Sequence, residues 1–557
     1  MTRTTIAAIV LATAAAAQPA PEAQHHDTIA APHRLGAGST QRRLTLQQAV
    51  EIAIRSNLDV AIERANVDDA GQAIRGARGA FDPAMHWQST AGDSNTPAPS
   101  VLQGADGILS QHNAGQTVSW QQKTPWNGLN FSAEFDASRI TSANPFVSLT
   151  PFYTTQLAFT VTQPLVRGRA IDADRALIII RRRNRDASAA ELEARAIDVA
   201  AQVERSYWDL VAARRRVDVD LDAANLAKTQ FEQNRRMIAA GSLPPVELSA
   251  SEAELQARLD DLYRSTGDVT EVEDNLKSLL ARDRHDGLWD EEIIPTDDGA
   301  ATQPGLVELS EATSQALAHR PELKQIAANA AANEVSKQQN ADQLKPQINL
   351  VANYTLAGLA GRVQSGADPF TSAMAPVYQR LDALSAQAGL PPLPQATLGA
   401  LPGSVSGGLG GSLSSLFNGH YQTVQAGFTL DFTVHNRTAA ANLESAAIAG
   451  KRLELMRARA EQAIEAQVRD ALQALDTARQ RVRAANAGER AAGDKLSSET
   501  RLFAAGESTN FLVLTRQNEY LDARLRCVDA ETALWKAVSR YQAALGTTLS
   551  GRGIEVE

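Results

Sequence analysis

The segment YTTQLAFTVTQP alternates between apolar and polar side chains almost without error. Its bulky residues at 153–161 fall mostly on one side, while Thr, Gln and Ala fall on the other. This alternation predicts a strand with one apolar face. The same pattern recurs at 348–356 and 424–432, and a shorter version begins at Met85 and Trp87. The chain is therefore predicted to contain four such strands.

The segments that join paired strands, 91–150 and 358–420, are rich in Gly, Ser, Pro and Ala and are predicted to be long loops. Within the first of them, VSWQQ at 118–122 and LNFSAEF at 129–135 also fit a hairpin. Whether residues 116–138 add further strands is left open by the pattern. Alternation also occurs in soluble sandwich strands, so it does not by itself indicate a membrane.

Two very long helices are predicted at about 170–240 and 437–505, each with a narrow apolar seam of the coiled-coil kind. Each seam is followed by a turn, at 240–245 or 505–510, and by a returning helix. Both turns contain Gly at the position where a helix end favours positive φ. The seam positions are Val199, Val203, Tyr207, Leu210, Val217, Phe231 and Ile238, which recur as Ile464, Val468, Leu472, Leu475, Val482, Leu496 and Phe503.

The chain repeats itself once, with a shift of 263 to 266 residues. LTLQQAVEIAIRSNLDV at 44–60 matches VELSEATSQALAHRPEL at 307–323, and the seams and returning helices match in the same order. A duplicated unit of this length indicates two copies of one structural repeat. The predicted organisation is a signal peptide at 1–17, a flexible N-terminal arm at 18–43, repeat 1 at 44–300, repeat 2 at 301–549 and a C-terminal tail at 550–557.

The N-terminus has the features of an export signal: Arg3, a short apolar run and an Ala-rich cleavage site before Gln18. After it, no run of eighteen apolar residues follows, so a membrane role would have to use strands. The strands have the length that crosses a bilayer in a barrel, but four are too few to close one. Because lipid forbids an open sheet edge, several chains would have to share the barrel.

Composition narrows the function classes. The net charge of −10 argues against a nucleic-acid coat, and the single Cys527 excludes a disulfide within the chain. No catalytic motif or cofactor-binding loop is found, and no metal site is predicted. His25, His26 and His33 fit a disordered tail better than a metal site. The basic runs at 181–185 and 214–216 fit a solvated, ion-paired helix face better than a phosphate patch.

Several duplicated blocks resemble the TolC-like outer-membrane efflux channels. These are the entry helices LTLQQAVEIAIRSNLDV and ALAHRPELK, the strand-to-helix joins QPLVRGR and DFTVHNR, and the returning segment AAGESTNFLVLTRQNEYLDARLRC. The resemblance covers about 44–548. It implies an α+β membrane protein with four transmembrane strands and long helical hairpins in each chain. Three chains would form a twelve-stranded β-barrel, continued by an α-helical barrel in the periplasm.

The resemblance also implies partners and sites. A homotrimer in outer-membrane lipid would meet a periplasmic adaptor, which links it to an inner-membrane pump. The acidic gate pair of some members is absent, so a constriction at Leu512 with Thr515 and Glu507 is the gate hypothesis. The adaptor-contacting tips are predicted at Gly241, Ser242, Pro244, Gly506, Ser508 and Thr509, and the membrane-facing residues at Leu157, Phe159, Val161, Leu350, Tyr354, Phe428, Leu430 and Phe432.

The predicted function is therefore the exit duct of a tripartite efflux or type I secretion system in a Gram-negative bacterium, extending from the outer membrane into the periplasm. An exported periplasmic coiled-coil adaptor or scaffold with a soluble β domain is the alternative, and it predicts extraction without detergent. An enzyme would need a pocket with clustered titratable groups, which the sequence does not indicate. The sequence does not identify the transported substrate or the type of pump.

Overall fold

The computed structural model describes residues 28–34, 40–98, 107–242, 244–297, 305, 307–364, 369–393 and 401–555. The predicted signal peptide and the first part of the arm lie outside these residues. The chain forms two compact units, and the long helices α3 (Ala173–Ala239) and α9 (Arg437–Ala504) contribute to both. Both helices fall within three residues of the bounds that the seam pattern predicts, so that prediction is confirmed.

Unit 1 is formed by the described residues up to Asn57, by Asp198–Leu309 and by Val468–Glu555. It holds the second parts of α3 and α9 and the returning helices that pair with them. Its other elements are β1 (Thr40–Leu44), α1 (Leu46–Ser56), α4 (Val246–Leu280), η3 (Gly287–Asp290), β6 (Glu291–Pro295), α10 (Asn510–Leu545) and η5 (Ser550–Arg552).

Unit 2 is formed by Leu58–Ile197 and by Ser310–Gln467. It holds a sheet, the first parts of α3 and α9, and shorter helices. Its elements are α2 (Leu58–Arg78), η1 (Gly79–Phe81), β2 (Ala84–Pro97), β3 (Ile108–Lys123), β4 (Asn130–Ser142), β5 (Leu149–Pro164), α6 (Pro321–Gln343), β7 (Gln347–Val363), α7 (Pro369–Gln387), η4 (Gly403–Val405), α8 (Leu409–Phe417), β8 (Gln422–Asp431) and nearly all of α5 (Leu309–His319).

The core of unit 1 is built on the predicted seam. Val203, Tyr207 and Leu210 of α3 and Val468 and Leu475 of α9 are fully buried. Closer to the ends of these helices the seam residues are only half-buried. The seam therefore holds the middle of the helical unit within one chain and leaves apolar surface near the helix ends.

The described parts of the N-terminal arm, 28–34 and 40–43, make ordered contacts where the sequence predicts a flexible segment. Residues 40–44 form β1, which pairs in parallel with β6. The backbone N–H of Ile29 donates to the side-chain oxygen of Asn225 on α3, at 2.8 Å. The next helix, α1, begins with a capping box, in which Thr45 accepts from the N–H of Gln48 and Gln48 accepts from the N–H of Thr45. The described part of the arm is thus fastened to unit 1.

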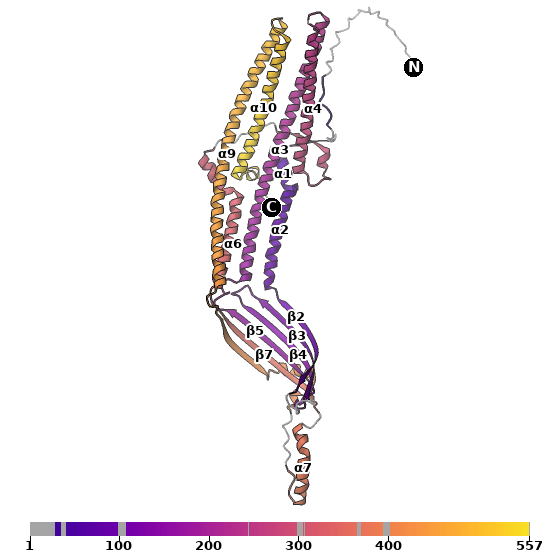
Figure 1. The fold of residues 1–557 in the computed structure, drawn as a ribbon, viewed down its shortest axis with the longest axis vertical. Coiled ribbons are helices and arrows are strands. Elements are labelled where there is room, and N and C mark those ends of the chain that lie inside the picture. The colour runs from indigo at the N-terminus through magenta and orange to yellow at the C-terminus, as the bar shows by residue number, and fades with distance from the viewer. Residues whose placement is uncertain are drawn as a thin grey trace, which may run out of the picture. The chain divides into compact units, whose positions relative to one another are not determined.

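The sheet of unit 2 contains six strands, in the order β2-β3-β4-β5-β7-β8, and the four-strand prediction is wrong. Figure 1 shows this sheet, with β2, β3, β4, β5 and β7 labelled. The hairpin of β3 and β4 accounts for the difference, and it contains the two segments, 118–122 and 129–135, for which the sequence left a hairpin open. It lies in the segment predicted as a loop at 91–150, where most described residues belong to strands. The predicted loop at 358–420 likewise contains the end of β7 and the helices α7 and α8. The sequence analysis missed the full length of β3 and β4 and the helices α7 and α8, because the Gly and Ser content of these segments reports average propensity and not pairing or packing.

Pairing places apolar side chains on one face of the sheet, because residues directly opposite each other share a face. We call this the apolar face and the opposite one the polar face. One row of the apolar face reads, across the six strands, Met85, Trp120, Ala133, Phe159, Tyr354 and Val424; the adjacent row on the polar face reads His86, Ser119, Glu134, Ala158, Thr355 and Thr423.

The residues predicted to face a membrane lie together on the apolar face. Leu157, Phe159 and Val161 oppose Leu356, Tyr354 and Ala352, while Leu350 opposes Phe428. Phe432 follows the last residue of β8. Phe428, Leu430 and Phe432 are each at least 65% exposed in the single chain. Among the described residues, no helix combines the length and the apolar character needed to cross a membrane.

Candidate functional site

The two hairpin turns of unit 1 have the same backbone geometry. Gly241 and Gly506 adopt φ of +74° and +80°, which glycine tolerates without steric strain. Each turn closes with the two hydrogen bonds of a Schellman motif. The bonds run from Gly241 N to Ile238 O (2.9 Å), Ser242 N to Met237 O (2.8 Å), Gly506 N to Phe503 O (3.0 Å) and Glu507 N to Leu502 O (2.9 Å). The duplicated glycines are helix C-caps, as their spacing predicts.

The returning helices begin differently. At the second turn, Thr509 caps α10 by accepting from the N–H of Leu512, and Ser508 donates to the carboxylate of Glu499. At the first turn, α4 follows Pro245 and has no side-chain cap. Ser242 and Pro244 are exposed. The predicted tip residues therefore lie at the two turns, where a partner could reach the exposed backbone.

The predicted gate residues lie on or beside the start of α10. Leu512 is 37% exposed, and Glu507 is exposed in the turn. The hydroxyl of Thr515 donates to the carbonyl oxygen of Phe511 at 2.8 Å, within its own helix. Leu512 is thus the predicted gate residue with apolar surface available to a neighbouring chain.

A buried polar cluster behind the second turn was missed by the sequence analysis. Asn510 accepts from Gln230 Nε2 at 3.1 Å and donates to Glu247 Oε2 at 3.0 Å, so it joins α3, α4 and α10. Gln230 also donates to Asn234, which is fully buried. The available signal was the occurrence of two amides four residues apart beside the seam position Phe231.

An ion-pair ladder connects α3 with α10. It consists of Asp209–Lys536, Arg215–Glu531, Arg216–Asp529 and Asp222–Arg524. Between the two helices, the rings of Trp208 and Trp535 stack with centroids 5.0 Å apart. The ladder confirms that the basic run at 214–216 is an ion-paired helix face. Its side chains are between 27% and 64% exposed, so each pair contributes about 0–1 kcal/mol and is sensitive to salt.

The comparison with protein families matches one segment of the chain. Residues 371–547 match the family described as outer membrane efflux protein. The matched segment covers less than half of the chain. The match lies in repeat 2 and includes the second hairpin turn and the whole of α10. No curated protein matches the chain by sequence.

The fold of the chain is similar to that of solved outer-membrane channels. OprN is 14% identical, with a TM-score of 0.59 and coverage of 90% of both chains. CmeC of Campylobacter jejuni is 14% identical, with a TM-score of 0.59, over 92% of this chain and 86% of CmeC. VceC of Vibrio cholerae is 13% identical, with a TM-score of 0.57, over 90% of this chain and 96% of VceC. At these identities the likeness establishes the fold.

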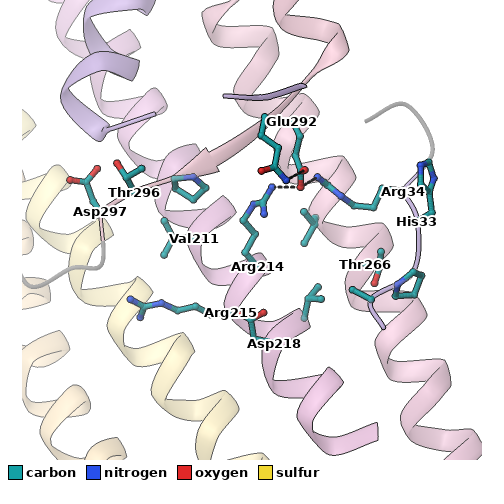
Figure 2. A pocket seen from close by; sticks show the side chains of 16 residues that line it. His33, Arg34, Val211, Arg214, Arg215, Asp218, Thr266, Glu292, Thr296 and Asp297 are labelled. Atoms are coloured by element: carbon teal, nitrogen blue, oxygen red, sulfur yellow. Dashed lines mark hydrogen bonds and ion pairs between the residues drawn. The ribbon is translucent and has the colours of Figure 1, made fainter. Parts of the chain in front are cut away.

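A cavity of about 700 Å³ in unit 1 lies where the N-terminal arm passes α3 and α4. Figure 2 shows Arg34 and Arg214 reaching Glu292 of β6 from opposite sides. Arg34 also pairs with the buried Glu273, at 2.8 Å. Burial opposes the ionisation of Glu292, but the hydrogen bonds of Arg214 and Gln41 and the nearby charges outweigh it and lower its pKa. Across the cavity, burial raises the pKa of the Asp218 carboxyl, and the charge of Asp222 adds to this effect. The ion pairs of Arg34 with Glu273 and Glu292 at this cavity hold the arm against unit 1. We call them the ionic fastening of the arm.

Replacing Glu292 with Gln should lower the free energy of unfolding by about 2–3 kcal/mol, because it leaves two largely buried guanidinium groups without their shared carboxylate. Glu291→Gln is the matched control, since Glu291 pairs with the more exposed Arg42. Denaturant unfolding of the detergent-solubilised protein measures both. Because the pKa of Glu292 is lowered in the folded state, its ionised carboxylate stabilises the fold at pH values above the ordinary pKa of Glu. This stabilisation is lost as the pH falls through the folded-state pKa, and Glu292→Gln should remove this pH dependence. Equal effects of the two variants would contradict the fastening.

Proposed function

We propose that the protein is the outer-membrane exit duct of a tripartite efflux or type I secretion system. Three copies would form the duct, and each would meet a periplasmic adaptor that connects it to an inner-membrane pump. The observation that carries the proposal is the open six-stranded sheet with one apolar face. Its edge strands, β2 and β8, each have a single neighbour. Because an unpaired edge is not tolerated in lipid, further copies must supply the missing pairing.

The strand count changes the expected barrel. Six strands from each of three chains give eighteen strands, in place of the twelve predicted from sequence. In this arrangement β2 of one chain pairs with β8 of the next, the apolar face meets lipid, and the polar face lines the passage. Since barrel diameter grows roughly linearly with strand number, the passage would be about one and a half times as wide as with twelve strands.

Extraction and mass measurement test the proposal. The protein should leave the outer-membrane fraction only in detergent and run as a trimer in size-exclusion chromatography with light scattering. A trimer would then allow the strands to be counted directly by electron cryo-microscopy. A monomer or dimer released from the periplasm without detergent would overturn the duct and favour the periplasmic adaptor or scaffold.

The opening mechanism proposed here is a movement of the α9–α10 hairpin away from the α3–α4 hairpin. The ladder connects these hairpins through exposed ion pairs, which can be exchanged for water at little cost. The buried Asn510 cluster adds a second polar contact between them. The stacked rings of Trp208 and Trp535 also join α3 to α10. In the closed state, Leu512 of three chains would narrow the passage near the second turn, with Thr515 and Glu507 beside it. Energy for opening would come from the pump.

The tips allow a test of adaptor docking that leaves the C-cap intact. Asn accepts the left-handed conformation at a C-cap, and a Cβ at Gly506 meets no atom within 4 Å. Gly506→Asn should therefore change stability by less than about 1 kcal/mol, yet weaken adaptor binding if adaptor helices approach the glycine closely. Co-purification with the adaptor and thermal unfolding measure the two effects. Gly553→Asn, at another positive φ, is the control. Unchanged binding would leave Gly506 with a capping role alone.

A further inference from the structure

Helix α8 packs directly on the sheet, across β5 and β7. The hydroxyl of Thr155 on β5 lies 2.9 Å from Ser412 Oγ and 3.1 Å from the Ser412 carbonyl oxygen. Thr155 is 2% exposed and Ser412 is completely buried. A buried polar contact of this kind fixes the position of the helix, because separating the two groups would leave both without a partner.

The approach is so close that the sheet needs a glycine beneath the helix. A Cβ at Gly358 of β7 would lie 2.1 Å from the Ser412 carbonyl oxygen and 2.7 Å from the Leu416 amide nitrogen. Gly411 on the helix faces Ala360 in the same way, with a Cβ only 3.2 Å from that of Ala360. The sequence of both elements is thus fitted to this contact.

The register decides which face α8 covers. Thr155 opposes Gly358, and two residues along the same strands Leu157 opposes Leu356. Residues two apart on a strand share a face. Helix α8 therefore lies on the apolar face, next to the row of Leu157 and Leu356, and leaves the polar face uncovered.

The outward side of α8 continues the apolar face. Its sequence, LGGSLSSLF, contains no charged residue. Ser412, Ser415 and Leu416 are buried toward the sheet, whereas Leu409 and Phe417 are 43% and 72% exposed. Helix α8 thus exposes Leu and Phe beside the apolar face, as an interfacial membrane helix does. It lacks the basic residues that are common in such helices.

We propose that α8 is a lipid-contacting helix, seated on the outside of the sheet with Leu409 and Phe417 at the outer boundary of the bilayer. This inference rests on the proposed function, in which the apolar face meets lipid. It assigns the second long loop, 358–420, a helix that widens the lipid-contacting surface. It also means that α8 does not obstruct the passage along the polar face.

Site-directed spin labelling tests the proposal in the full chain, reconstituted in vesicles of phosphatidylethanolamine and phosphatidylglycerol. Cys527 is replaced by Ser, although burial and the nearby Glu489 already raise its thiol pKa to about 12 and make it a poor target for labelling. A label at Phe417→Cys should collide more with oxygen, which concentrates in lipid, than with a water-soluble nickel chelate. Phe428→Cys on the apolar face should behave alike, and Gln425→Cys on the polar face should show the reverse order.

The three labels separate the two proposals. A lipid-like label at Phe428→Cys with a water-like label at Phe417→Cys would overturn the assignment of α8 and leave the lipid-facing sheet intact. Water-like labels at both positions would overturn the lipid-facing sheet and, with it, the role of α8. Lipid-like labels at both positions support both proposals.

Displacing α8 provides a second test. Gly358→Val should push the helix off the sheet and remove the lipid-like signal of the Phe417→Cys label. Gly427→Val on β8 is the matched control, because a Cβ there meets no atom within 4 Å. Gly411→Leu, which changes only the helix, serves where Gly358→Val fails to fold. An unchanged label in the folded Gly358→Val or Gly411→Leu protein would overturn the seating of α8.

Discussion

Reversing two charges of the ladder, with Arg216→Asp and Arg524→Asp, should open the closed duct. Each substitution replaces an attraction, to Asp529 or Asp222, by a repulsion between carboxylates. At up to about 1 kcal/mol for each exposed pair, the double variant shifts the balance by up to about 2 kcal/mol in each chain and up to about 6 kcal/mol in a trimer. Because 1.4 kcal/mol is a factor of ten, conductance in planar lipid bilayers should rise about tenfold.

Two controls distinguish opening from general damage. Arg264→Asp removes ion pairs that lie within α4 and do not join the hairpins, so it should leave the conductance low. A second double variant, Asp222→Arg with Arg524→Asp, exchanges the two charges of one pair and keeps their attraction, so its conductance should stay low. High salt should raise the conductance of the unaltered protein in the same direction, since it screens exposed charges. A double reversal that folds but conducts like the unaltered protein would exclude the ladder from the gate.

Phe428→Arg should prevent assembly in the outer membrane, whereas Thr429→Arg should be tolerated. The two residues are neighbours on β8, but Phe428 opposes Leu350 on the apolar face and Thr429 opposes Asn349 on the polar face. An arginine on the lipid face of a barrel costs about 2–4 kcal/mol near the bilayer centre, and a trimer incurs the cost three times. A side chain in a water-filled passage avoids that cost.

The amount of folded trimer recovered from the outer-membrane fraction measures both variants. Because the substitutions introduce the same side chain at adjacent positions of one edge strand, strand propensity and expression affect them equally. Thr429→Arg should also alter ion selectivity, as expected for a residue in the passage. Equal recovery of the two proteins would show that the apolar face does not meet lipid.

The long helices, their turns and three of the strands could be predicted because each carries a periodic signal over many residues. The seam of α3 repeats in α9, and its buried positions Val203 and Tyr207 are those that the spacing selects. Because the pattern occurs twice, an irregular position in one copy can be checked against the matching position in the other. This is why the bounds of both helices were predicted closely.

The pattern left the hairpin of β3 and β4 open, since only short parts of it alternate strictly. Much of it consists of Gly, Ser, Gln and Asn, whose place in a strand depends on pairing with neighbours. Helix α8 was missed because Gly and Ser usually favour loops, whereas here Gly411 and Ser412 allow close packing on Gly358. The polar cluster around Asn510 depends on three helices meeting, and the local pattern offered only the two amides Gln230 and Asn234, four residues apart.

The additional hairpin has a topological consequence. Because β3 and β4 enter the sheet as a pair, the number of strands remains even, and the first and last strands of the chain run in opposite directions. Copies placed in a ring can then join edge to edge with antiparallel order preserved throughout. Inserting a single strand would instead make the first and last strands run in the same direction, so that neighbouring copies would join through a parallel pair. It would also leave the chain at the end of the sheet opposite to the helices. Channel proteins of this architecture can thus vary in circumference in steps of one hairpin per chain, without redesigning the subunit junction.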